Sequence, residues 1–145
     1  MKAEPRLFVV AVLWIACIAS LVAQSVRERD PSWTAPLRDG AKSNPLADHP
    51  AVLAGGRKLY GQRCTTCHGD DGRGTDRAPG LAVADVQAQT DGELFWQITS
   101  GNTHGGMPSF SFLPEAQRWQ LVSHLRNLIA KHADQPNAGQ APDLD

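Results

Sequence analysis

Two cysteines and a histidine lie close together near the middle of the chain, where the sequence reads CTTCH from Cys64 to His68. This spacing lets two thiols add to the two vinyl groups of a haem while the adjacent imidazole reaches the iron. The motif therefore predicts one covalent haem c, attached through Cys64 and Cys67, with His68 as an axial iron ligand. A chain that folds around a haem disc takes part of its core from the cofactor, which constrains the fold more than any other feature here.

A Cys-x-x-Cys pair has two other common uses, and each needs further residues. A thioredoxin-like redox pair lies between a strand and a helix, whereas here a helical pattern precedes the pair and glycines follow it. A tetrahedral zinc site needs a second pair of ligands, but the remaining histidines are dispersed, at His49, His104, His124 and His132. Haem attachment is the interpretation that the surrounding sequence favours.

The iron needs a second axial ligand, and Met107 is the only methionine besides the initiator. It lies in a Gly-Gly-Met-Pro segment without helical or strand periodicity, and its thioether is a soft donor that suits electron transfer. His104 is the competing ligand, and an open site is the third possibility. Pro79 offers a carbonyl, without an amide of its own, to the second ring nitrogen of His68.

Three segments predict helices. Residues 50–62 carry apolar side chains at helical spacing, and Thr90 with Glu93 forms a capping box for a helix ending near residue 100. Pro114 opens a third helix, whose apolar stripe is Leu121, Val122, Leu125, Leu128 and Ile129. No segment shows the alternation of apolar and polar residues that is typical of a strand, so the predicted fold is all-α.

The N-terminus has the order of an export signal. Lys2 and Arg6 precede an uninterrupted apolar run over residues 7–23. As a helix this run would be about 25 Å long, somewhat short of a hydrocarbon core of about 30 Å. Residues 1–25 are therefore either a cleaved signal peptide or a retained membrane anchor, with lipidation at Cys17 as a weaker alternative.

The rest of the chain divides into three predicted parts. Residues 26–49 contain three prolines and no periodicity, and are interpreted as a linker that spaces the domain from the membrane or wraps its surface. The haem domain occupies residues 50–131, and residues 132–145 form a disordered tail. A formal net charge of -1 without long runs of one sign argues against a nucleic-acid partner.

Residues 50–130 resemble the class I cytochrome c family. The resemblance rests on the motifs already described, on Gly56 followed by Leu59-Tyr60, and on Trp119-x-Leu121-Val122. It is strongest with small bacterial members that are periplasmic or membrane-tethered. One departure is His124, which stands where relatives often carry an aromatic residue.

The resemblance implies a cytochrome c fold of three to four helices around one haem, with the first and last helices crossing near Gly56. It also implies axial ligation by His68 and Met107, and a hydrogen bond from His68 to the Pro79 carbonyl.

The expected function is to carry single electrons between a donor and an acceptor redox protein, in the periplasm, either soluble or tethered to the inner membrane. The chain would be a carrier rather than an enzyme, and a haem-ligation machinery would be its biosynthetic partner. Two rival functions stay open: an electron-accepting haem subunit of a dehydrogenase or oxidase, and a gas-binding sensor.

Overall fold

The computed structural model describes residues 30–47 and 49–133. The predicted signal or anchor segment and the tail beyond residue 133 lie outside these residues. Within the described part of the chain, no helix is both long enough and apolar enough to cross a membrane.

The described residues form helices and loops, with one isolated backbone bridge in place of any strand. The helices are α2 (Leu37–Gly40), α3 (Pro50–Arg63), α4 (Thr65–His68), α5 (Ala84–Gln87), α6 (Asp91–Ser100) and α7 (Glu115–Ala133). The all-α prediction is confirmed. The three long helices are those that the sequence predicts, and the three helices of four residues each are additional.

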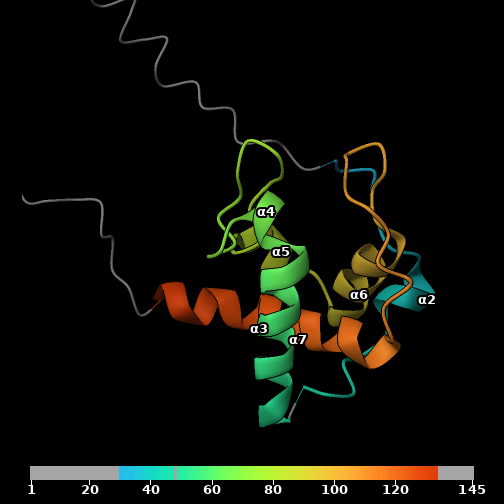
Figure 1. The fold of residues 1–145 in the computed structure, drawn as a ribbon. Coiled ribbons are helices and arrows are strands. Elements are labelled where there is room, and N and C mark those ends of the chain that lie inside the picture. The colour runs from blue at the N-terminus through green and yellow to red at the C-terminus, as the bar shows by residue number, and fades with distance from the viewer. Residues whose placement is uncertain (1–29, 48, 134–145) are drawn as a thin grey trace, which may run out of the picture.

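The two longest helices, α3 and α7, cross steeply at the centre of the molecule (Figure 1). Gly56 lies at the crossing, where a Cβ atom would overlap the Gln120 carbonyl oxygen. His124 is 4% exposed, and its ring lies 4.9 Å from that of Tyr60, between centroids. A buried imidazole therefore packs at the crossing where relatives often carry an aromatic ring.

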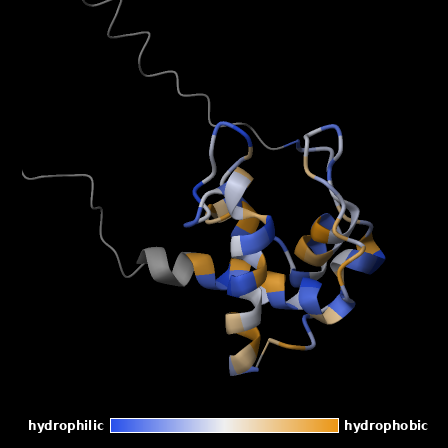
Figure 2. Cartoon of the chain, in the orientation of Figure 1, coloured by the Kyte–Doolittle hydropathy of each residue, from blue (hydrophilic) through white to orange (hydrophobic). Residues whose placement is uncertain are grey.

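Helix α6 packs against α7 and carries the predicted capping box. Thr90 Oγ1 accepts from Glu93 N at 3.1 Å, and Glu93 Oε2 accepts from Thr90 N at 2.6 Å. Phe95 of α6 stacks on Trp119 of α7 with ring centroids 4.0 Å apart. Figure 2 shows hydrophobic and hydrophilic residues interleaved along the helices. Helices α6 and α7 contribute most of the buried hydrophobic core.

Helix α7 begins at Glu115, one residue later than predicted. Pro114 immediately precedes the helix, and its carbonyl accepts a hydrogen bond from the first helical turn. Arg118 N donates to Pro114 O at 3.2 Å. Of the predicted apolar stripe, Ile129 has a side chain outside the described part, and the others are buried, namely Leu121, Val122, Leu125 and Leu128.

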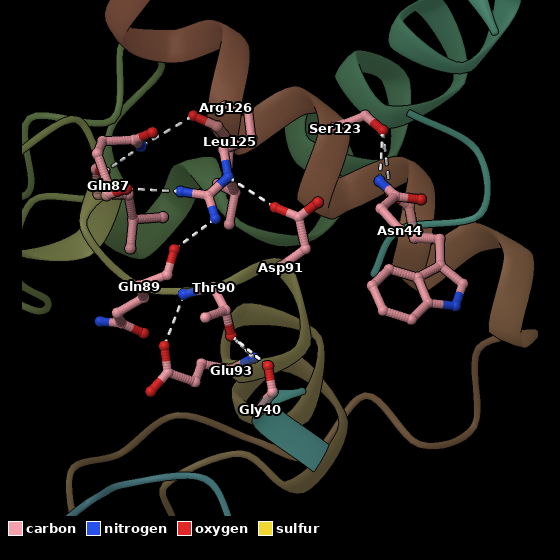
Figure 3. Close-up of polar contacts among 12 residues, drawn as sticks. Gly40, Asn44, Gln87, Gln89, Thr90, Asp91, Glu93, Ser123, Leu125 and Arg126 are labelled. Carbon is pink, nitrogen blue, oxygen red and sulfur yellow. Dashed lines mark hydrogen bonds and ion pairs between the residues drawn. The ribbon is translucent and has the colours of Figure 1, made fainter. Parts of the chain in front are cut away.

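Residues 30–47, which we call the strap, run along α6 and α7. Asn44 is 8% exposed, and its Nδ2 donates to Trp119 O at 3.2 Å and to Ser123 Oγ at 2.8 Å (Figure 3). Thr90 Oγ1 donates to Gly40 O at 2.6 Å. The strap is therefore bonded to the helical domain through both side chains and backbone.

Candidate functional site

A cavity of about 630 Å³ lies between two loop regions. One is α4 with the loop that follows it, and the other is the loop that joins α6 to α7 (Figure 1). All five residues that the sequence singles out line this one cavity: Cys64, Cys67, His68, Pro79 and Met107. The fold thus brings together segments that are far apart in the sequence.

The end of α3 and the short helix α4 place the two cysteines and the histidine. Cys64 N donates to Tyr60 O at 2.9 Å, and His68 N donates to Cys64 O at 2.9 Å. Residues three or four apart on a helical turn lie on one face, so Cys64, Cys67 and His68 all reach the cavity. Gly69, with φ of 77°, ends the turn in a conformation that favours glycine.

The chemistry of Cys64 argues against a redox-active thiol. Burial first, and then the neighbouring Cys67, raise the pKa of Cys64 to about 11. A reactive cysteine needs the opposite shift, toward the thiolate at neutral pH. The pair is half-buried and not joined by a disulfide, and it faces a cavity of a size typical for a bound cofactor.

His68 is held in the protonation state that an iron ligand needs. It is 9% exposed, and its Nδ1 lies 2.9 Å from Pro79 O. Burial lowers the pKa of His68, and the hydrogen bond to Pro79 opposes this only in part. Because a carbonyl can only accept, Nδ1 carries the proton of the neutral ring, and Nε2 keeps a free lone pair. The contact with Pro79 is the one that the family resemblance implies.

The irregular glycine-rich loop that carries Pro79 is held by hydrogen bonds to carbonyl groups of α4. Gly74 N donates to His68 O at 2.9 Å, and Thr75 Oγ1 donates to Cys67 O at 2.6 Å. Gly74 has a φ of 89°, and a Cβ there would meet Gly80 N at 2.6 Å. This tight turn fixes the position of Pro79 relative to His68.

Met107 lies on the loop between α6 and α7. Asn102 and Met107 exchange two backbone hydrogen bonds of 2.9 and 2.8 Å, which close the loop between them. Met107 is half-buried and packs against the hydrophobic core. His104 also lines the cavity but is exposed, so Met107 is the better placed of the two candidate ligands.

The remaining walls suit a large, flat, mostly apolar group with charged edges. Apolar side chains come from α6, α7 and the loop between them, among them Leu94, Ile98, Phe110, Leu121 and Leu125. Arg63 and Arg77 also line the cavity and can neutralise carboxylates. The cavity presents two thiols that can bond to the haem vinyl groups, together with an imidazole and a thioether that can coordinate iron, so the residues present fit haem c.

Sequence reasoning missed the part of the wall that comes from the strap, in particular Trp33. A tryptophan in an otherwise polar, proline-containing segment was the available signal, because a large aromatic side chain rarely stays without packing partners.

A family model described as "Cytochrome C oxidase, cbb3-type, subunit III" matches residues 51–125, just over half of the chain. The chain belongs to this family. No curated protein matched the chain. Family membership confirms the class I cytochrome c resemblance, the haem c cofactor and a function in electron transfer. Cys64 and Cys67 of this cytochrome have the spacing of the haem attachment motif, followed directly by His68.

Proposed function

We propose that this cytochrome is a one-electron carrier of the periplasm, acting between a donor and an acceptor redox protein, with His68 and Met107 as its axial ligands. The observation that supports this proposal is that one cavity presents both an imidazole from α4 and a thioether from the loop after α6. Two ligands supplied by the chain leave no coordination site for a substrate, which is what an electron carrier needs.

When bound, haem c supplies an iron that alternates between the ferrous and ferric states and so holds one electron. Cys64 and Cys67 would fix it covalently, and His68 would coordinate through Nε2 while Nδ1 donates to Pro79 O. This hydrogen bond keeps the imidazole in one orientation and raises its basicity. Buried apolar side chains on the cavity wall, among them Leu94, Ile98 and Leu121, would surround the haem with an apolar environment.

The proposed location rests on the N-terminal sequence. Lys2, Arg6 and the apolar run over residues 7–23 are typical of export, whether the segment is cleaved or kept as a tether to the inner membrane. A free Cys-x-x-Cys pair tends to oxidise in such a compartment, so a haem-ligation machinery is the biosynthetic partner that we propose. Mass spectrometry of the mature N-terminus distinguishes a cleaved signal peptide from a retained anchor.

The carrier function is tested on the purified holoprotein by reduction and exposure to carbon monoxide. A pyridine haemochrome spectrum of the c type, with one haem per chain, is expected. An electron carrier with both axial positions filled binds carbon monoxide slowly or not at all. Rapid and complete binding by the wild-type protein would instead favour a gas-binding sensor and contradict our proposal.

A second candidate is a haem subunit that passes electrons within an oxidase complex. The description of the matched family favours it. Phe112 also offers a contact site for a partner, because it is 64% exposed and its ring centre lies 5.9 Å from the Arg63 guanidinium at the cavity. Affinity purification of the tagged chain in mild detergent distinguishes the oxidase subunit from the separate carrier. A stoichiometric oxidase in the eluate supports the subunit, and a single protein supports the separate carrier.

A further inference from the structure

The strap is fixed to the helices that carry the haem cavity. Thr90 Oγ1 donates to Gly40 O at 2.6 Å at the start of α6. Gly92, also on α6, has no side chain where the strap passes, and a Cβ there would overlap the Asp39 carbonyl oxygen. Such a close approach of two backbones requires glycine. The strap therefore has a defined course along the domain, set by contacts outside the cavity.

The first residues of the strap reach the cavity itself. Asp30, Pro31 and Trp33 all line it, as does Met107. Figure 1 shows the start of the strap, in blue, beside the loop between α6 and α7. The Trp33 ring is half-buried, and its centroid lies 6.4 Å from that of Trp96 on α6, at an interplanar angle of 47°. This wall of the cavity thus comes from a segment that precedes the first long helix.

Trp33 is hydrogen-bonded to α6 and to Gly101, the residue that directly follows this helix. Its Nε1 donates to Gly101 O at 3.0 Å, and its own carbonyl accepts from Gln97 Nε2 at 3.4 Å. Gln97 is 7% exposed, so this second contact is partly buried. Trp33 is therefore held through its indole nitrogen and through its own carbonyl, by one hydrogen bond each.

Gly101 is the base of the loop that carries Met107. It has a φ of 66°, and a Cβ there would meet the Pro108 backbone at 2.5 Å. The next residue, Asn102, exchanges the two backbone hydrogen bonds with Met107. The hydrogen bond from Trp33 to Gly101 thus lies one residue away from Asn102, which is paired with Met107 and sets the position of its thioether.

The start of the strap also faces this loop through Asp30. Asp30 lines the same cavity as Asn102 and His104 of the loop. The start of the strap thus approaches the loop through Asp30 as well as through Trp33.

We propose that Trp33 is a positioning residue for Met107, and that the start of the strap completes the wall that keeps small ligands from the iron. This inference rests on the proposed assignment of Met107 as an axial ligand. The strap lies outside residues 51–125, which match the family model, so family membership alone does not imply it.

The test is a titration of the ferric holoprotein with imidazole. Binding is monitored as the loss of the sulfur-to-iron charge-transfer band, which disappears as imidazole displaces Met107. Trp33→Phe keeps an aromatic ring but removes the Nε1 donor, and its imidazole affinity should rise about fivefold, as the loss of one average hydrogen bond predicts. Trp33→Ala also opens the wall, and its affinity should rise on the order of tenfold or more.

Two controls separate positioning from general loss of stability. Leu37→Ala changes a side chain of the same strap that is 94% exposed, and it should leave imidazole affinity unchanged. Val52→Ala removes buried apolar volume away from the cavity, and it should lower the denaturation midpoint without changing imidazole affinity. If Val52→Ala raises the affinity as much as Trp33→Phe does, the effect is general destabilisation and the inference is wrong.

The outcomes also separate this inference from the function on which it rests. A wild-type protein without the sulfur-to-iron band would overturn the Met107 assignment, and the role of Trp33 with it. A wild-type protein with the band, whose Trp33→Ala variant binds imidazole no more tightly than Leu37→Ala, would keep Met107 as the ligand and overturn only the role of Trp33.

Discussion

Gly56 of α3 lies directly against the main-chain carbonyl of Gln120 in α7. A Cβ atom at residue 56 would overlap that oxygen and would come within 2.9 Å of His124 Cβ. Neither neighbour is the flexible end of a side chain, so neither can move away without shifting α7. The closest approach of the two longest helices therefore depends on the missing side chain of Gly56.

Gly56→Ala should lower the free energy of unfolding by about 1–3 kcal/mol or more, because the added methyl group forces the helices apart. Denaturant unfolding of the holoprotein, followed by circular dichroism, measures this change. Gly61→Ala is the matched control in the same helix, since a Cβ at residue 61 meets nothing within 4 Å. It should be neutral or stabilising by up to about 1 kcal/mol. Equal stability of the two variants would contradict the packing argument.

Met107→Ala should abolish the sulfur-to-iron charge-transfer band of the ferric protein. Met107 is the only methionine in the described part of the chain, and the cysteine sulfurs would be held in thioether bonds. An absorption spectrum of the oxidised variant measures this loss. His104→Ala is the control, because His104 lines the same cavity but is exposed. Survival of the band in Met107→Ala would show that the ligand assignment is wrong.

Features that depend on residues close together in the sequence were predictable. The capping box of Thr90 and Glu93 fixes where α6 begins, and it is present in the structure as predicted. The same holds for the attachment motif, since one helical turn is enough to bring Cys64, Cys67 and His68 to a common face. The capping box and the attachment motif follow from local geometry, so they can be predicted without knowledge of the tertiary fold.

The packing of the strap depends on residues far apart in the sequence, so apart from Trp33 its local pattern does not indicate where it packs. Trp33 bonds to Gly101, and Asn44 bonds to Trp119 and Ser123. The prolines of this segment remove periodicity, so neither a helical nor a strand pattern indicates which side faces the domain. The helices of four residues escape prediction for a related reason, because one turn is too short to show an apolar stripe.

Thr90→Ala should destabilise the protein by about 1–2 kcal/mol, because it removes the N-cap of α6. The same hydroxyl also donates to Gly40 O in the strap, so the loss should reach the upper part of this range. Thr90→Ser is the control, since serine keeps both hydrogen bonds. Thermal unfolding of the two holoprotein variants measures the difference. If serine is as harmful as alanine, the missing methyl group and not the hydroxyl is responsible.

Arg126 joins α7 to the end of α5, the start of α6 and the residues between them. Its guanidinium donates to Asp91 Oδ1 at 2.8 Å, to Gln87 O at 2.8 Å and to Gln89 O (Figure 3). Its side chain is 30% exposed, so water replaces only part of what is lost when the guanidinium is removed. Arg126→Met keeps most of the apolar stem, and it should lower the free energy of unfolding by about 1–2 kcal/mol.

Arg73→Met is the matched control for Arg126→Met, because Arg73 also pairs with a carboxylate, on Asp71. The two side chains of that pair are 68% and 51% exposed, and an exposed ion pair contributes about 0–1 kcal/mol. Denaturant unfolding at low and high salt compares the variants. The effect of Arg126→Met should persist at high salt, since two of its acceptors are neutral carbonyls that salt screens less than a carboxylate. An effect that disappears in salt would mean that only the ion pair with Asp91 stabilises the fold.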